Sequence, residues 1–126
     1  MERIQVTALD HVQIAAPSGS EGALRDFYGG LLGLREREKP EPLRSRGGVW
    51  FDCGNLELHI GIDRTAPLNR PSKRHVALSV SDLAVARTRL IEAGCDLEED
   101  SAPIGGLERF YVRDPVGNRV EILKRN

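Results

Sequence analysis

The sequence lacks three features that would place the chain in a specialised class of protein. It has no apolar run approaching the ~20 residues needed to span a bilayer, and its first ten residues, MERIQVTALD, contain no apolar core of a signal peptide. It also has no cationic block, because 18 Lys and Arg residues are interspersed with 19 Asp and Glu residues and the net charge is -1. We therefore expect no membrane partner, no nucleic-acid partner and a cytoplasmic location.

Cysteine is also scarce. Cys53 and Cys95 stand far apart, without a CxxC or other zinc-type spacing. Each is expected to be a small buried hydrophobe in a reducing compartment. What is present is an ordinary globular composition of 126 residues, 40% hydrophobic and 29% charged. A chain of this size can bury one domain's core without a disulfide or a structural metal.

The order of the predicted elements indicates two copies of one βαβββ unit. Helical spacing over 18–34 follows a first strand, and helical spacing over 81–94 follows a fifth. The first unit covers 6–62 and the second 73–125, and the linker 63–72 joins them within a single domain. The strands are expected at 7–16, 34–39, 49–53 and 56–62 in the first unit, and at 74–80, 95–100, 108–114 and 118–124 in the second.

Capping residues and apolar stripes support the two helices. Ser18 or Ser20 can cap the first helix, Ser81 is expected to cap the second, and Gly94 is a C-terminal signal. The segment 40–48, PEPLRSRGG, is expected to be a loop. The apolar stripe of the first helix is Leu24, Phe27 and Leu31, with Tyr28 as a further candidate, and that of the second is Leu83, Ala86, Leu90 and Ile91.

Corresponding residues of the two units lie a constant distance apart in the sequence. His11 and His75 begin corresponding strands at an offset of 64, and Glu57 and Glu121 lie in the last strands at the same offset. Because strands alternate their faces, all four side chains leave the face opposite the aliphatic one. That aliphatic face must pack under the helices, so the polar face should be the concave side of a curved sheet.

Two histidines and two carboxylates on one concave surface suggest a divalent metal site. Two glutamates in a poorly solvated cleft would be costly without a counter-ion. Nitrogen and oxygen ligands with room for water suit Ni, Co, Zn, Mn or Fe. His59 lies on the same face as Glu57, so it can replace Glu57 as the ligand, position Glu57 through a hydrogen bond, or line the substrate cavity.

The motifs DHVQI, RDFYGGLLGL, LELHIG, RHVALSV and RDPVGNRVEIL, over about residues 7–124, resemble the vicinal oxygen chelate superfamily, the group of glyoxalases, bleomycin resistance proteins and extradiol dioxygenases. The resemblance implies an α+β fold in which two βαβββ modules form an incomplete mixed β-barrel with a metal and substrate cleft, commonly in a homodimer. It implies metal ligands at His11, Glu57, His75 and Glu121. Whether one chain or a swapped dimer completes the cleft stays open.

Such a site predicts a metal-dependent lyase or isomerase for a small molecule with vicinal oxygens. The metal would polarise a carbonyl, and Glu57 or Glu121 would act as the base on a carbon-bound proton. Each candidate substrate contact also has a purely structural interpretation, either as an aromatic side chain packed in the fold or as a solvated surface arginine. These candidates are Arg44, Arg46, Trp50, Arg109 and Tyr111.

Three alternatives remain open. An iron-dependent extradiol-type dioxygenase would use His11 or His59 with His75 and Glu121. A thiol transferase that confers antibiotic resistance would bind a phosphonate in a cationic pocket, for which the arginines of 39–46 are available. The third alternative is a non-catalytic small-molecule or drug binding protein.

Overall fold

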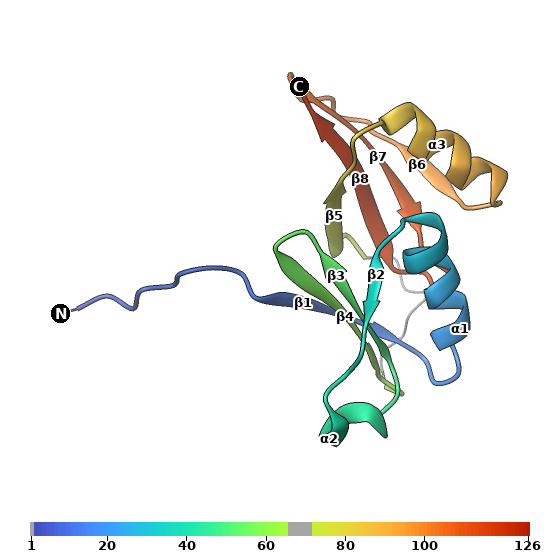
Figure 1. Ribbon diagram of the computed structural model, residues 1–126. Helices are drawn as coiled ribbons and strands as arrows, with labels where there is room; N and C mark the ends of the chain where they lie inside the picture. The colour runs from blue at the N-terminus through green and yellow to red at the C-terminus, as the bar shows by residue number, and fades with distance from the viewer. Residues whose placement is uncertain (1, 66–71) are drawn as a thin grey trace.

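Two four-stranded mixed sheets form the framework of the molecule (Figure 1). The structure is a computed structural model, and it describes residues 2–65 and 72–126. The strand orders are β1-β4-β3-β2 and β5-β8-β7-β6, so the two sheets repeat one topology. The first sheet contains β1 (His11–Ala16), β2 (Arg35–Arg37), β3 (Val49–Cys53) and β4 (Leu56–Ile62), and the second contains β5 (His75–Ser79), β6 (Leu97–Glu99), β7 (Leu107–Arg113) and β8 (Arg119–Arg125).

The predicted α+β fold class is confirmed. Each sheet has one parallel pair, β1 with β4 or β5 with β8, and its remaining pairs are antiparallel. Over the described residues the sheets do not close into a barrel, as expected for an incomplete one. Residues 66–71 of the expected linker 63–72 lie outside the described part of the chain.

The helices of the first unit differ from expectation in three places. The first predicted helix is a short α1 (Glu21–Leu24) followed by a π-helix, η1 (Arg25–Leu31). Ser20 occupies the N-cap position of α1, but its hydroxyl donates to the carbonyl of Pro17 and accepts no hydrogen bond from the helix. The expected loop 40–48 contains the short helix α2 (Glu41–Arg44), which has a proline in its first turn.

The prediction that Ser81 caps the second helix, α3 (Leu83–Glu92), was wrong. Asp82 is the N-cap, because its extended backbone lets the carboxylate accept from the backbone N–H of Val85 at 3.0 Å. The expected apolar stripe was also wrong at Ile91, which is 57% exposed. Gly94 ends this region with a φ of 79°, in the left-handed region that glycine tolerates.

One hydrophobic core serves both sheets. Aliphatic residues of alternate strand positions enter it together with buried residues of η1 and α3, as the strand alternation predicted. The two cysteines are only partly buried. The core consists of Ala16, Leu24, Phe27, Tyr28, Val49, Phe51, Leu58, Ile60, Leu90, Phe110, Val112, Val120 and Ile122.

A buried polar network also joins the two units. The Tyr28 hydroxyl donates to Oδ2 of Asp114 at 2.7 Å, across 86 positions of sequence. Asn118 donates from Nδ2 to the carbonyl of Ala15 in β1 and to the same Asp114 carboxylate. Breaking a buried, satisfied network is costly, so the shared core and this network hold the two sheets in a fixed relation.

Residues 2–10 form an arm that carries no helix or strand. Figure 1 shows it running away from the body of the molecule before β1. Its apolar side chains Ile4, Val6 and Leu9 are 91%, 85% and 61% exposed. None of the helices in the described residues is long and apolar enough to cross a membrane.

Candidate metal and substrate site

The polar faces of the two sheets carry the predicted residues. In the first sheet His11 pairs with Glu57, and Glu57 pairs with Asp52. Residues paired across neighbouring strands point to the same face. The register therefore places the first histidine and the first glutamate on one side of the sheet, away from the core. We call His11 and Glu57 the first half-site.

The imidazole of His11 is oriented through its Nδ1 atom. This atom lies 2.7 Å from Oδ1 of Asp10, the residue just before it in sequence. We assign the ring proton to Nδ1, since the carboxylate accepts it, and this leaves the lone pair on Nε2 free. A hydrogen bond from the second ring nitrogen is the usual support of a histidine that binds a metal.

His59 lies behind Glu57 in a stack of three rings. Its ring stacks on Trp50 at a centroid distance of 3.6 Å and on His11 at 4.2 Å. Its Nε2 atom lies 3.0 Å from Oε1 of Glu57. The His59 side chain is 6% exposed, whereas that of Glu57 is 29% exposed. The glutamate therefore presents the accessible donor atoms, and His59 and Trp50 form the wall behind it.

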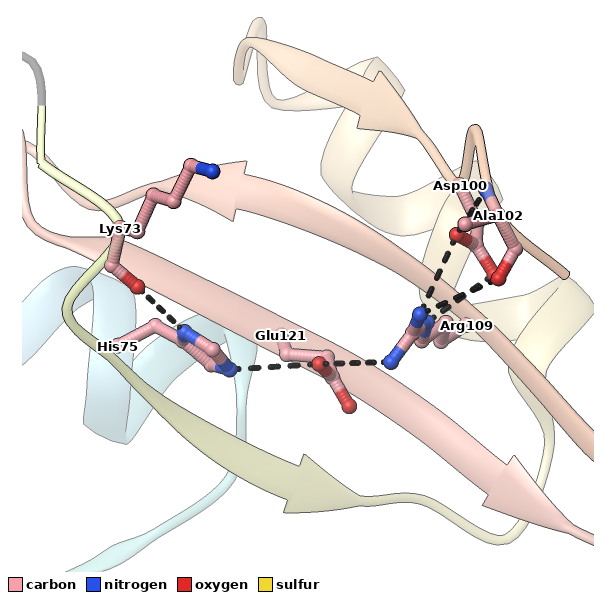
Figure 2. A network of polar contacts seen from close by, with 6 residues as sticks. All are labelled: Lys73, His75, Asp100, Ala102, Arg109 and Glu121. Carbon is pink, nitrogen blue, oxygen red and sulfur yellow. Dashed lines mark hydrogen bonds and ion pairs between the residues drawn. The ribbon is translucent and has the colours of Figure 1, made fainter. Parts of the chain in front are cut away.

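His75 and Glu121 form the second half-site, shown in Figure 2. Nδ1 of His75 lies 2.8 Å from the carbonyl oxygen of Lys73, an acceptor that requires the proton on this nitrogen. Nε2 is again left free and lies 3.4 Å from Oε1 of Glu121. Both histidines of the predicted quartet thus have Nδ1 occupied and Nε2 available.

The two half-sites are not identical in register. His11 pairs with Glu57, but His75 pairs with Arg119, and Glu121 pairs with Ala77. The equal offset of 64 therefore does not produce equal pairing. A shift of two residues keeps a side chain on the same face, because the strand period is two. The histidine and glutamate remain neighbours on the polar face.

Glu121 is held between His75 and a guanidinium. Nη1 of Arg109 lies 3.6 Å from its Oε1, and Nε of Arg109 donates to Asp100 at 3.0 Å (Figure 2). The hydrogen bond from Arg109 lowers the pKa of Asp100. Tyr111 meets the ring of His75 edge-on, and partial burial together with the Glu121 charge raises the pKa of its hydroxyl.

The described residues contain no group of three or more His, Cys, Asp or Glu side chains placed to hold a metal ion. The four predicted ligands thus lie in two separate half-sites of one chain, each offering one imidazole and one carboxylate. Two protein ligands are fewer than the three or four that metal centres with these donors have.

The five predicted substrate contacts lie in different places. Trp50 stacks in the wall of the first half-site, and Arg109 and Tyr111 lie beside the second. Arg44 instead pairs with Glu38 and donates to the carbonyl of Lys39, and the side chain of Arg46 is exposed.

The sequence interpretation missed several residues of the site. Asp10 orients His11, and Arg37 lies 3.5 Å from Glu57 while donating to Asp52. Arg119 stacks over the ring of Tyr111 at 3.8 Å. The alternation of strand faces places Arg119 on the face of Glu121 and would have placed Arg37 as well, but neither arginine was predicted to belong to the site. No local signal showed that Asp10, in the approach to β1, turns toward the histidine.

Residues 8–122 match the family model described as the Glyoxalase/Bleomycin resistance protein/Dioxygenase superfamily. A glyoxalase family protein from Bacillus anthracis is similar at 41% identity, with 99% of this chain and 100% of that chain covered and a TM-score of 0.87. No curated protein matches the sequence significantly.

More distant solved structures share the fold. A glyoxalase family protein from Enterococcus faecalis has 26% identity, a TM-score of 0.71 and coverage of 93% of this chain and 97% of its own. A lactoylglutathione lyase from Agrobacterium tumefaciens has 23% identity, a TM-score of 0.70 and coverage of 94% of each chain.

Proposed function

Because the chain belongs to the glyoxalase/bleomycin resistance protein/dioxygenase superfamily, we propose that it is a divalent-metal-dependent lyase or isomerase for a small substrate with two adjacent oxygens. One observation carries the proposal. Each sheet presents a histidine whose Nδ1 is hydrogen-bonded and whose Nε2 is free, next to a glutamate. This is the donor arrangement of a histidine and carboxylate metal centre.

In this proposal the metal ligands are His11, Glu57, His75 and Glu121. Two neutral imidazoles and two carboxylates suit Ni, Co, Zn, Mn or Fe, and they balance the charge of a divalent ion. His59 is a support and not a ligand, because its Nε2 already bonds to Glu57 and its ring is enclosed by two others. Glu57 then keeps its accessible oxygen for the metal.

A second copy of the chain completes each site in this proposal. The shared core and the Tyr28–Asp114 contact resist a movement of one sheet onto the other within a chain. β1 and β5 both lie at the outer edge of their sheets, where another copy can approach. The exposed apolar arm of residues 2–10 offers further surface to a partner. A homodimer would form two equivalent sites, each from the first half-site of one copy and the second of the other.

The proposed chemistry is a proton transfer next to a carbonyl. The metal, when bound, supplies a Lewis acid that polarises the substrate oxygens. Glu57 or Glu121 takes the carbon-bound proton and returns it to the neighbouring carbon. Arg109 and Tyr111 contact the substrate beside Glu121, and Trp50 closes the wall behind Glu57. The fold shared with the Agrobacterium lactoylglutathione lyase makes lyase activity the first to assay.

The test begins with metal analysis of protein purified without chelators. We expect stoichiometric metal in the wild type and its loss in His75→Ala. Nickel, cobalt or zinc together with solvent-deuterium exchange into a 2-oxo or thioester substrate supports the lyase or isomerase. Iron together with oxygen consumption would replace it with the dioxygenase.

Two further outcomes would favour the remaining alternatives. Metal-dependent attack of a thiol on an epoxide would indicate the thiol transferase. Absence of stoichiometric metal from the wild type, even after addition of each of the five ions, would leave a non-catalytic binding protein.

A further inference from the structure

A cavity of about 400 Å³ lies where β1 of the first sheet approaches the start of β5 and β8 of the second. Its volume is within the range of small-molecule sites. Its walls combine apolar side chains, among them Val12, Ile14 and Val76, with three arginines. These arginines are Arg74, Arg113 and Arg119, and we call them the arginine triad.

The arginine triad gives this cavity an excess of positive charge. Three guanidiniums face it against one carboxylate, Asp63, whose Oδ1 accepts hydrogen bonds from Thr65. Within the described residues none of the three arginines forms an ion pair with an Asp or Glu. Other arginines on the strands behave differently, since Arg109 pairs with Asp100 and Arg37 with Asp52.

Two members of the triad are direct neighbours across strands. Arg113 on β7 pairs with Arg119 on β8, so both side chains leave the same face of the second sheet. Like charges in directly opposed positions destabilise a sheet unless something compensates them. Arg113 donates to the carbonyl of Gly117, and Arg119 rests on the ring of Tyr111. Neither of these partners carries a negative charge at neutral pH.

One donor of Arg119 is both buried and unused. Its Nε atom is buried and has no hydrogen-bond partner in the described structure. A buried donor without a partner costs free energy that a bound acceptor would recover. Arg74 uses its Nε on Ser72 only, so its terminal nitrogens are also available in the described structure. Guanidiniums bind pairs of carboxylate or phosphate oxygens through paired donors.

We propose that this cavity binds the oxyanion group, a carboxylate or a phosphate, of a small molecule whose apolar part rests on Val12, Ile14 and Val76. His75 lines the same cavity, and its register partner is Arg119. The anionic end of the substrate therefore lies beside the metal ligands of the second half-site. This last step rests on the proposed function, whereas the oxyanion site itself does not.

The experiment uses the full-length protein freed of metal with a chelator and transferred to buffer without phosphate. Inorganic phosphate and acetate are titrated separately, and the arginine Nε–H resonances are followed by NMR. We expect saturable binding of one anion per chain with a shift of the Arg119 signal. Saturation by phosphate alone identifies a phosphorylated ligand, and saturation by acetate alone identifies a carboxylate. Failure of both anions to bind would overturn the proposal.

Substitutions distinguish anion binding in this cavity from nonspecific attraction of anions to a positively charged surface. Arg113→Gln and Arg74→Gln should each weaken anion binding by about tenfold or more, since each removes charge-assisted hydrogen bonds. Arg74 lies outside the strands, so its variant guards against a folding defect in Arg113→Gln. Arg89→Gln removes the same charge from an exposed position of α3 and should leave affinity unchanged. An equal loss in Arg89→Gln would contradict the proposal.

Because the protein is metal-free, this result is independent of the metal-dependent reaction. Anion binding that persists when metal analysis finds no metal would refute the proposed function alone. Stoichiometric metal without anion binding would refute the oxyanion site alone.

Discussion

The Nε2 atom of His59 lies 3.0 Å from Oε1 of Glu57. Both residues lie on β4 and point to the same face of the sheet, and this contact indicates which of them is the candidate metal ligand. His59 is enclosed between Trp50 and His11, whereas Glu57 remains partly exposed. A side chain that is stacked on both faces has little freedom to turn. The geometry therefore favours Glu57 as the ligand and His59 as the group that positions it.

Substitution of His59 by Phe tests this assignment. Phenylalanine keeps a flat ring in the stack but removes the hydrogen bond to Glu57. We expect metal affinity to fall about 10- to 100-fold, as for other supporting partners of metal ligands, with His59→Gln recovering part of the loss. A competition titration with a metal indicator measures the change. If Glu57→Gln keeps full affinity while His59→Phe loses all of it, the two roles are reversed.

Mixing two defective variants tests whether a site spans two chains. His11→Ala and His75→Ala should each lose stoichiometric metal. After the two variants are unfolded together and refolded, heterodimers contain one intact site and one doubly altered site. We expect metal in about a quarter of all sites, since half of the randomly formed dimers are mixed. Metal analysis of the mixture, with each variant refolded alone as control, would show no recovery if each site lies within one chain.

Metal should also stabilise the fold. A metal that binds only the native state adds about 2.7 kcal/mol to the free energy of unfolding when its free concentration is 100 times its dissociation constant. Chelator-treated protein should therefore unfold at a lower temperature and recover when metal is added. Thermal unfolding followed by circular dichroism measures this shift. Glu121→Gln serves as the matched control, and an equal shift in that variant would place the binding elsewhere.

Tyr28→Phe should destabilise the protein in a pH-dependent way. The buried hydroxyl donates to Asp114, so its removal is expected to cost about 1.5–3 kcal/mol, the range for a hydrogen bond to a charged group. Burial, followed by the Asp114 charge, raises the pKa of Tyr28 well above its usual value. A raised pKa favours the protonated form in the folded state, so this contribution is fully present below about pH 10, the ordinary tyrosine pKa.

The sign of this effect can be measured in alkali. Above pH 10 the unfolded tyrosine ionises first, and the advantage of the wild type is lost as the pH rises toward the folded pKa. Urea unfolding at pH 8 and at pH 11 should therefore show a smaller gap between wild type and Tyr28→Phe at the higher pH. A gap that widens with pH would contradict this account.

Gly48→Ala should damage the strand that carries Trp50. Gly48 has a φ of 87°, and an added Cβ would lie 2.3 Å from the carbonyl oxygen of Ile60. Gly54 also has a positive φ, 61°, but open space around it. We expect Gly54→Ala to cost about 1–2 kcal/mol for the left-handed backbone alone, and Gly48→Ala to cost clearly more. Denaturant unfolding of the two variants compares them directly.

The strand faces and the repeat could be predicted from the local sequence pattern. Alternation along HVQI and VEI places His11 and Glu121 opposite the aliphatic side chains, and the repeat pairs them with His75 and Glu57. The helix ends were less predictable. Ser81 and Asp82 are both good caps by residue type, and only the extended backbone at Asp82 selects it.

The sequence by itself determined the two βαβββ units, the face on which each candidate ligand lies and the donor chemistry of the four residues. These depend on periodicity and residue type, which are local properties. Tertiary structure alone decided that the four candidate ligands separate into two half-sites, that His59 lies behind Glu57, and that the arginine triad lines one cavity. These relations depend on how the shared core and the Tyr28–Asp114 contact orient one sheet against the other, and no local spacing encodes that orientation.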